Sequence, residues 1–335
     1  MIEVPSLAGA LGVKRLWIKN DAVSFPSLSF KDRVVATAIN AARALGLEAV
    51  GCASTGNLAN ALAAQATRAG IPSWIFIPDD LEQGKVIGTA VYGSHLVRVR
   101  GTYDDVNRLC VLVADRFGWG FVNINLRSYY GEGSKTLAIE TVEQLGWKLP
   151  TAVVAPMAGG SLVSKLHKGF GEFISDGLVD GRIPRVFGAQ ADGCAPIVRL
   201  VERGNGILEP EIPNTIARSI AIGNPADGNY AANVIRTSGG WARAVTDSEL
   251  VDGIQLLAEH AGVFTETAGG VTVAAARSLA EVGRLTKNDE VVLYITGNGL
   301  KTTEAVADKF GKHPLIQARI GDVQEVADQF LSTIS

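Results

Sequence analysis

Short apolar runs alternate along this chain with longer stretches in which apolar residues recur every three or four positions. Runs such as Ala49 to Ala53 and Val291 to Ile295 are short for helices and suit strands that are buried in a sheet. Because parallel strands need a crossover connection, usually a helix, the alternation predicts an α/β fold with a mainly parallel sheet. Similar strand candidates are Ser73 to Ile77, His95 to Arg100, Ala152 to Ala155 and Arg185 to Ala189.

Capping signals place the starts of two helices. Ser29 and Asp32 have the spacing of a capping box, so we expect a helix to begin near Ser29. Thr246 and Glu249 give the same signal for a helix that runs to Gly262. Further helices are expected over Leu58 to Arg68, Tyr103 to Phe117 and Asp322 to Leu331.

Composition excludes several classes of protein. A hydrophobic content of 47% and a net charge of −3 describe a globular chain, and no basic stripe predicts a nucleic-acid partner. The cysteines Cys52, Cys110 and Cys194 form no CxxC pair, so neither a disulfide framework nor a metal site is indicated. No long uncharged apolar run predicts a membrane span, and Met1 to Gly12 lacks the basic start of a signal peptide. We therefore expect a cytoplasmic protein.

Lys31, in the stretch Ser-Phe-Lys-Asp-Arg, falls in the first turn of a predicted helix. The positive end of the helix dipole lies there, which disfavours the ammonium form. A neutral amine is what Schiff-base chemistry requires, so Lys31 is a candidate catalytic residue. The alternative is a solvated surface lysine that is balanced by Asp32.

A second polar stretch, Ser54-Thr55-Gly56-Asn57, connects a predicted strand to a helix. Backbone N–H groups at a helix start bind anions, so a substrate carboxylate would fit there. The alternative is an ordinary helix cap, in which Ser, Thr and Asn are common.

Two glycine-containing turns follow other predicted strands. Met157 to Ser161 opens a helix without a Walker or dinucleotide-binding pattern, and so suggests a site for a single phosphate. Thr296 to Lys301 follows the strand that ends at Ile295, and its hydroxyl could meet a ligand there. In both cases the alternative is a plain glycine-rich turn.

Taken together and in this order, the four stretches resemble the threonine synthases, which depend on pyridoxal 5'-phosphate (PLP) and share the tryptophan-synthase β fold (PLP fold type II). The resemblance spans roughly Leu11 to Lys309. It implies a two-domain, three-layer α/β/α architecture and a homodimer. The smaller domain would comprise residues 37–123, and the larger one residues 1–36 plus 124–335. Family members usually carry a longer N-terminal segment, so relative to them the chain is short at this end.

The resemblance also implies roles for individual residues. Lys31 would form the Schiff base with PLP and Asn57 would bond to the ring oxygen of the cofactor. Thr296 would bond to the pyridine nitrogen. The cofactor phosphate would be held by Ala158, Gly159, Gly160 and Ser161, and the substrate α-carboxylate by Ser54 and Thr55.

A threonine synthase converts O-phosphohomoserine and water to threonine and phosphate, so the resemblance implies a site for the substrate phosphate as well. Arg127 is the best candidate, since arginine binds phosphate in a bidentate manner, and Asn125 would assist. Lys135 is a second option, and a surface salt bridge is the alternative role for Arg127.

Other functions remain compatible with these motifs. A related PLP enzyme could carry out β-replacement on O-phosphoserine with a sulfur or amine nucleophile, or in the manner of cysteate synthase. A serine or threonine dehydratase is disfavoured by the Thr-Gly-Asn-Gly-Leu-Lys stretch. A non-catalytic sensor of PLP or an amino acid is disfavoured by the retained Lys31 and Asn57.

Overall fold

The computed structural model of the protein describes residues 1–54, 56–79, 83–101, 103–311 and 313–334. The larger of its two β-sheets has six strands in the order β1-β2-β10-β7-β8-β9. The pairing of β1 with β2 is antiparallel and the other pairings are parallel. The strands are β1 (Ile2–Glu3), β2 (Arg15–Asn20), β7 (Ala152–Pro156), β8 (Arg185–Ala191), β9 (Ala242–Val245) and β10 (Glu290–Ile295).

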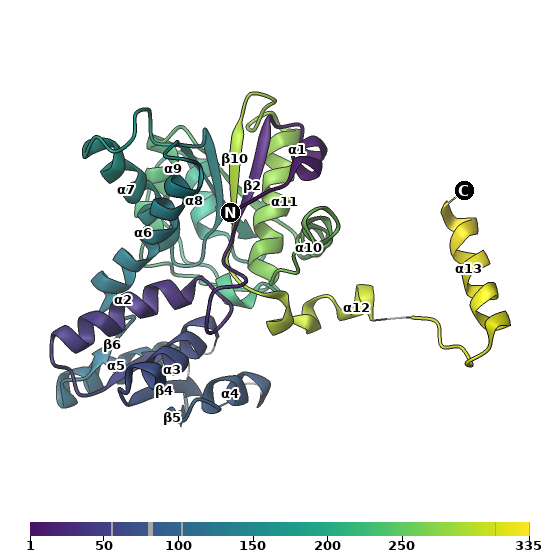
Figure 1. The fold of residues 1–335 in the computed structure, drawn as a ribbon. Coiled ribbons are helices and arrows are strands. Elements are labelled where there is room, and N and C mark those ends of the chain that lie inside the picture. The colour runs from purple at the N-terminus through teal and green to yellow at the C-terminus, as the bar shows by residue number, and fades with distance from the viewer. Residues whose placement is uncertain (55, 80–82, 102, 312, 335) are drawn as a thin grey trace.

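Helices cover both faces of the larger sheet (Figure 1). Successive residues of β7 point into different cores: Val153 belongs to one hydrophobic cluster and Val154 to the other. This explains why the strand reads as an uninterrupted apolar run. One face carries α6 (Arg127–Gln144), α7 (Ser161–Ser175), α8 (Pro196–Arg203) and α9 (Gly228–Thr237), and the other carries α1 (Pro5–Leu11), α10 (Asp247–Ala261) and α11 (Thr267–Glu281).

The smaller sheet contains four parallel strands in the order β5-β4-β3-β6. Helices α2 and α3 pack on one face, and α5 packs on the other. The predicted α/β fold with mainly parallel sheets between helical layers is therefore confirmed. The elements are α2 (Lys31–Ala44), β3 (Val50–Ala53), α3 (Asn57–Ala69), β4 (Ser73–Pro78), α4 (Gln83–Ala90), β5 (His95–Val99), α5 (Tyr103–Phe117) and β6 (Gly120–Phe121).

The C-terminal segment leaves the body of the molecule. The last helix, α13 (Ile320–Ile334), stands apart from the rest in Figure 1 and contains the predicted helix over 322–331. The remaining short helices are η1 (Arg218–Ile220), η2 (Gly299–Lys301), η3 (Thr303–Ala305) and α12 (Ala307–Phe310).

The two predicted capping boxes have different outcomes. Thr246 and Glu249 form the complete box at the start of α10. The box predicted at Ser29 is wrong, because α2 begins at Lys31 without a side-chain cap. The Asp32 carboxylate instead accepts hydrogen bonds from Ser27, from the backbone nitrogen at 3.0 Å and from Oγ at 2.8 Å. This contact holds the segment before the helix rather than the helix end.

An ionic network fixes the start of α2 against the larger sheet. The Arg33 guanidinium donates to Asp21, at 2.9 Å in one of the contacts, and to Glu140 of α6 at 2.8 Å. Lys19 of β2 also donates to Glu140, at 2.6 Å. Burial opposes ionisation of Glu140, but the hydrogen bonds from Arg33 and Lys19 prevail and lower its pKa from 4.5 to about 2.

Substitution Glu140→Gln should remove part of the acid sensitivity of the fold. A carboxylate whose pKa is lowered by folding stabilises the protein above its unfolded pKa, and this stabilisation is lost as the pH falls from 4.5 towards about 2. The variant should be less stable than wild type at neutral pH, and this difference should shrink through that window. Urea unfolding at several pH values measures it. Glu143 is an exposed residue of the same helix, so the difference in free energy of unfolding between Glu143→Gln and wild type should not change with pH.

Candidate active site

Lys31 and Thr296 are brought together although they lie at opposite ends of the chain. Thr296 is buried directly after β10, and its carbonyl oxygen accepts a hydrogen bond from the Phe30 nitrogen at 2.9 Å. Ser29 and Gly297 form an isolated β-bridge beside it. The carboxyl end of the central strand β10 therefore fixes the position at which α2 begins, and with it the backbone of Lys31.

The Lys31 amine is half-buried and has no carboxylate partner among the described residues. Its Nζ donates to the Tyr130 hydroxyl of α6 and lies 5.0 Å from the centre of the Tyr130 ring. The Phe30 ring centre is 4.7 Å from the same nitrogen. A surface lysine that is neutralised by Asp32 does not fit this arrangement, because Asp32 bonds to Ser27 instead.

Asn57 joins the smaller sheet to the larger one. It is the first residue of α3, and its Nδ2 lies 2.9 Å from Oε2 and 3.1 Å from Oε1 of Glu266. The Lys301 Nζ donates to the Asn57 Oδ1 at 2.8 Å. Glu266 precedes α11 and Lys301 lies in η2, so Asn57 bonds to two segments that flank the end of β10.

The glycine turn after β7 has the geometry of an anion site. Gly160 has a φ of +90° and precedes the 15-residue helix α7, so unpaired backbone N–H groups of that helix start are directed at the turn. The carbonyl oxygen of Gly159 accepts from the Asp227 nitrogen at 2.9 Å. The Asp227 carboxylate pairs with Arg127 at 2.8 Å.

Arg127 connects this turn to Lys31. It begins α6, and Tyr130 lies one turn further along the same helix. The chain of contacts from Thr296 through Lys31 and Tyr130 to Arg127, and on to the glycine turn, thus brings three of the predicted stretches together. Asn57 adds the fourth through Lys301.

Other predicted residues lie in less distinctive surroundings. Ser54 is half-buried after β3, and its Oγ accepts from the Gly56 nitrogen at 3.4 Å. Thr55 lies outside the described residues. Asn125 holds the turn before α6, since its Oδ1 accepts from the Phe121 nitrogen at 2.6 Å and its Nδ2 donates to the Trp119 carbonyl at 2.9 Å.

Lys135, the second option for the substrate phosphate, is engaged elsewhere. Its Nζ lies 2.5 Å from a carboxylate oxygen of Glu132 and 2.7 Å from one of Glu172. The first pair lies within α6, and the second links α6 to α7.

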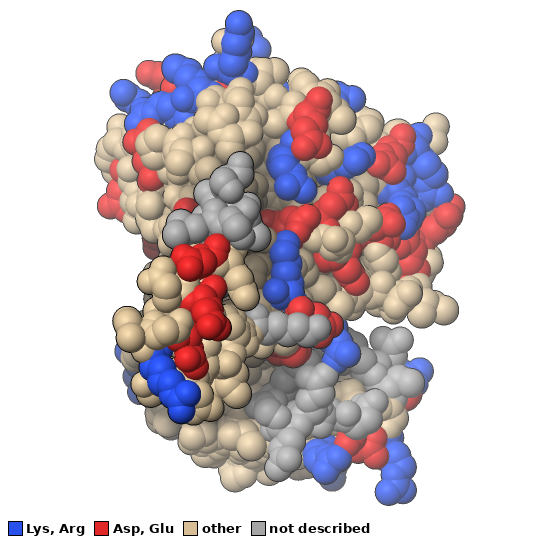
Figure 2. Space-filling view, turned by 90° about the vertical axis from the view of Figure 1, so that its right-hand side faces the viewer, with Lys and Arg blue, Asp and Glu red and all other residues tan. Residues whose placement is uncertain are grey.

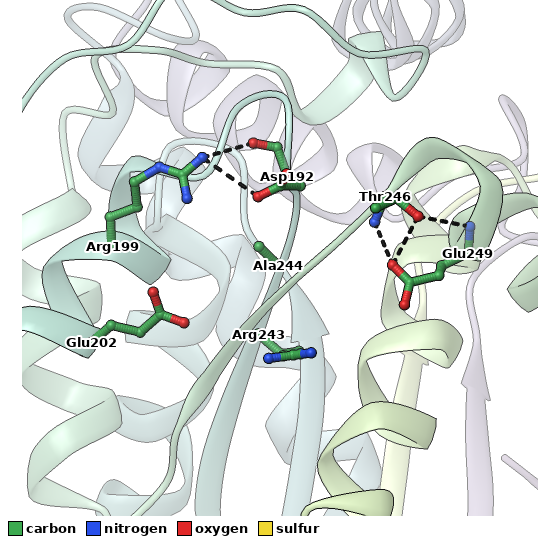
Figure 3. Close-up of a pocket in the computed structure, with 7 residues that line it drawn as sticks. All are labelled: Asp192, Arg199, Glu202, Arg243, Ala244, Thr246 and Glu249. Carbon is green, nitrogen blue, oxygen red and sulfur yellow. Dashed lines mark hydrogen bonds and ion pairs between the residues drawn. The ribbon is translucent and has the colours of Figure 1, made fainter.

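A separate hollow lies away from this cluster. It is bounded by α8, β9 and the start of α10, and no predicted site residue lines it. Figure 3 shows Arg199 turned towards Asp192 on one side and the Thr246–Glu249 cap on the other. Both charge signs are present, so the lining favours no particular ligand. The lining residues are Asp192, Arg199, Glu202, Arg243, Ala244, Thr246 and Glu249.

The charge distribution on the surface and the potential metal ligands of the described residues do not indicate a second site. Acidic and basic side chains are interspersed over the visible described surface in Figure 2, without a broad area of one sign. Among the residues that the structure describes, no cluster of His, Cys, Asp or Glu could hold a metal ion. Within the same described ranges, no helix has the length and apolar character needed to cross a membrane.

Comparison with known proteins identifies the family. Residues 1–297 match the family described as "Pyridoxal-phosphate dependent enzyme". The chain belongs to this family. It is 37% identical to a threonine synthase of Methanocaldococcus jannaschii over 303 residues, which cover 90% of this chain and 74% of that protein. It is 34% identical to a threonine synthase of Methanosarcina acetivorans, with 95% of this chain and 78% of that protein covered.

Solved structures of the same fold type agree with the architecture. A maize serine racemase matches 92% of this chain and 91% of its own with a TM-score of 0.76, at 22% sequence identity. At that identity the likeness concerns the fold, which is the PLP fold type II arrangement predicted from the motifs.

The site residues fit PLP, the cofactor of this family. Within the described ranges Lys31 offers an amine without a carboxylate partner, as a Schiff base requires. At Gly159 a Cβ atom would meet nothing within 4 Å, so open space lies beside the turn at the helix start. A phosphate could approach the backbone there. Two contributors, Tyr130 and Asp227, were not singled out from the sequence. Lys301 ends the last of the four motifs, and Glu266 begins a Glu-Thr-Ala-Gly-Gly stretch that also resembles the family, but neither was given a role.

Alanine substitutions at Gly159 and Gly160 should have different effects. In the cofactor-free protein, Gly160→Ala should lower the free energy of unfolding by about 1–2 kcal/mol, because L-residues rarely adopt its φ of +90° and a Cβ would lie 2.8 Å from the Asp227 carbonyl oxygen. Gly159→Ala should change this stability little but should weaken PLP binding, since its methyl group would occupy the open space.

Thermal unfolding without PLP and fluorescence titration with PLP measure the two effects. Equal destabilisation by both substitutions, or full PLP affinity in Gly159→Ala, would contradict the assignment of the open space to the cofactor.

Proposed function

We propose that this PLP enzyme is a threonine synthase, which converts O-phosphohomoserine and water to threonine and phosphate. The observation that carries the proposal is the chain of contacts that connects Lys31, Asn57, Thr296 and the glycine turn beside the carboxyl ends of β7 and β10. The 37% identity to a threonine synthase over 90% of the chain supports the choice of reaction.

Lys31 is the proposed catalytic residue. When bound, PLP supplies the electron sink that stabilises negative charge at the carbon atoms next to the substrate amine. The Lys31 amine would carry the cofactor and afterwards accept and return protons at Nζ. Its half-buried setting between the Phe30 and Tyr130 rings limits the access of water to this nitrogen.

The remaining cofactor contacts are proposed for Asn57, Thr296 and the glycine turn. Asn57 would donate to the ring oxygen and Thr296 would bond to the pyridine nitrogen. A neutral hydroxyl cannot keep that nitrogen protonated as a carboxylate can, so the ring would be a weaker electron sink. Such a site suits chemistry in which a leaving group, here phosphate, takes up the charge. The phosphate of the cofactor would lie at Ala158, Gly159, Gly160 and Ser161.

The substrate would be a phosphorylated amino acid that binds through its two anionic groups. We assign its α-carboxylate to Ser54 and Thr55 of the Ser-Thr-Gly-Asn stretch, and its phosphate to Arg127 with the help of Asn125. Arg127 is 47% exposed in its side chain and pairs with Asp227, so an incoming phosphate would compete with a carboxylate for the guanidinium.

We further propose a cytoplasmic homodimer, as the family resemblance suggests. Sedimentation should give twice the mass of the single chain, and a single-chain mass at micromolar concentration would contradict it.

The deciding assay follows threonine and phosphate release from O-phosphohomoserine with PLP present. We expect both products in equal amounts, and none from Lys31→Ala. The visible absorbance of the lysine-bound cofactor should be lost on borohydride treatment in the wild type, with the cofactor left covalently attached, and should be missing from the start in that variant. Phosphate release from O-phosphoserine alone would instead place the chain among the β-replacement enzymes.

Arg127→Gln should raise the KM for O-phosphohomoserine at least tenfold at saturating PLP, because about 1.5–3 kcal/mol is typical of a hydrogen bond to a charged group. The kcat should fall less. Lys135→Gln serves as the comparison, since its amine is paired with Glu132 and Glu172. A KM effect in Lys135→Gln but not in Arg127→Gln would reverse the assignment.

A further inference from the structure

A buried acid beside the active site has no role in the proposed reaction. Glu266 is only 3% exposed and immediately precedes α11. Its side chain does not cap that helix but turns to Asn57, with both carboxylate oxygens within hydrogen-bond distance of Nδ2. Burying an ionisable group is costly unless it is paired, so this position calls for an explanation.

The partners of Asn57 determine which way its amide faces. An ionised carboxylate can only accept hydrogen bonds and an ammonium group can only donate them. Glu266 therefore takes the amide nitrogen and Lys301 takes the amide oxygen, at 2.8 Å. The two oxygens of one carboxylate lie too close together to receive both diverging N–H bonds, so one N–H of Asn57 remains as a donor.

The absence of a side chain at Gly297 leaves space for the Glu266 carboxylate. A Cβ atom on Gly297 would lie 2.3 Å from Glu266 Oε1, so the glycine after Thr296 leaves room for the carboxylate. The Glu266 backbone nitrogen also donates to the Gly297 carbonyl at 3.1 Å. The acid thus contacts both the segment that carries Thr296 and the residue that starts α3.

Charges around Glu266 oppose the effect of burial. Burial is the largest effect and raises the pKa of Glu266, while the hydrogen bond from Asn57 and the charges of Lys301 and Lys31 offset part of this rise. Burial likewise lowers the pKa of Lys301, and the charges of Glu266 and Asp32 raise it. Each group therefore depends on the other for its ionised form.

We propose that Glu266 and Lys301 are positioning residues that lock the Asn57 amide with its nitrogen towards the cofactor, leaving one N–H for the ring oxygen. Reversal of the amide would place an oxygen against that oxygen. This inference rests on the proposed cofactor contact of Asn57 and adds two residues that act through it.

The experiment compares PLP affinity and the visible spectrum of the lysine-bound cofactor across pH. Glu266→Leu removes the acceptor and should weaken PLP binding about tenfold, with the pH midpoint of the visible band shifted as in Asn57→Ala. Glu266→Gln keeps an acceptor oxygen and should stay within about threefold of wild type. Glu290→Gln is the matched control, since Glu290 pairs with Lys14 at the other end of β10 and should change neither quantity.

The double variant Asn57→Ala/Glu266→Leu separates positioning from general stability. When one residue acts only through another, the effects of substituting them do not add. The double variant should therefore bind PLP as Asn57→Ala does, with no further shift of the visible band. Should Glu266→Leu fail to fold, Lys301→Met takes its place. This substitution should weaken PLP binding when it is made in the wild-type protein and should have no further effect when it is made in Asn57→Ala.

Two outcomes overturn the inference alone: unchanged affinity and spectrum in Glu266→Leu, or effects that add in the double variant. In both, wild type still shows a visible band that Lys31→Ala lacks, so the proposed function stands. A wild-type protein that forms no Lys31-dependent band with PLP overturns the proposed function and the inference together.

Discussion

The geometry of the site depends on how the buried positive charge of Arg33 is compensated. Its guanidinium is largely buried two residues after Lys31, and a buried cation is tolerated only when carboxylates surround it. Asp21 follows β2 and Glu140 lies on α6, so both must stay in place for the charge to be compensated. The start of α2, the edge of the larger sheet and the helix that carries Arg127 and Tyr130 are thereby fixed relative to one another.

The second constraint is that the site needs both sheets. Lys31, Thr296 and the glycine turn belong to the larger sheet or its edge, whereas Asn57 begins a helix of the smaller one. The contacts of Asn57 with Glu266 and Lys301 are polar and few. They add a polar link beside the close packing of α2 on α6, where a Cβ atom on Gly133 would lie 2.7 Å from the Cα atom of Val34.

The sequence predicted the elements whose signals are local. The Thr246 capping box formed as expected because its donor and acceptor lie within one turn. Continuous apolar runs identified the buried strands, and short motifs singled out Lys31, Asn57 and the glycine turn. The Ser29 box failed because the Asp32 carboxylate found partners in the preceding segment. Glu266 and Lys301 lie in stretches that resemble the family, but their roles could not be predicted, since their common partner, Asn57, is 209 and 244 residues away in the chain.

The strand order also bears on how the chain is made. The smaller sheet is complete within residues 50–121, so its four strands can pair soon after they leave the ribosome. Strand β2, by contrast, has β10 as its parallel neighbour, with Arg15 opposite Glu290. Until that late segment has been synthesised, the backbone N–H and C=O groups on one side of β2 lack their strand partner, and Lys31 has no Thr296 beside it. The Lys31 amine therefore lies in a complete binding site only when nearly the whole polypeptide has emerged.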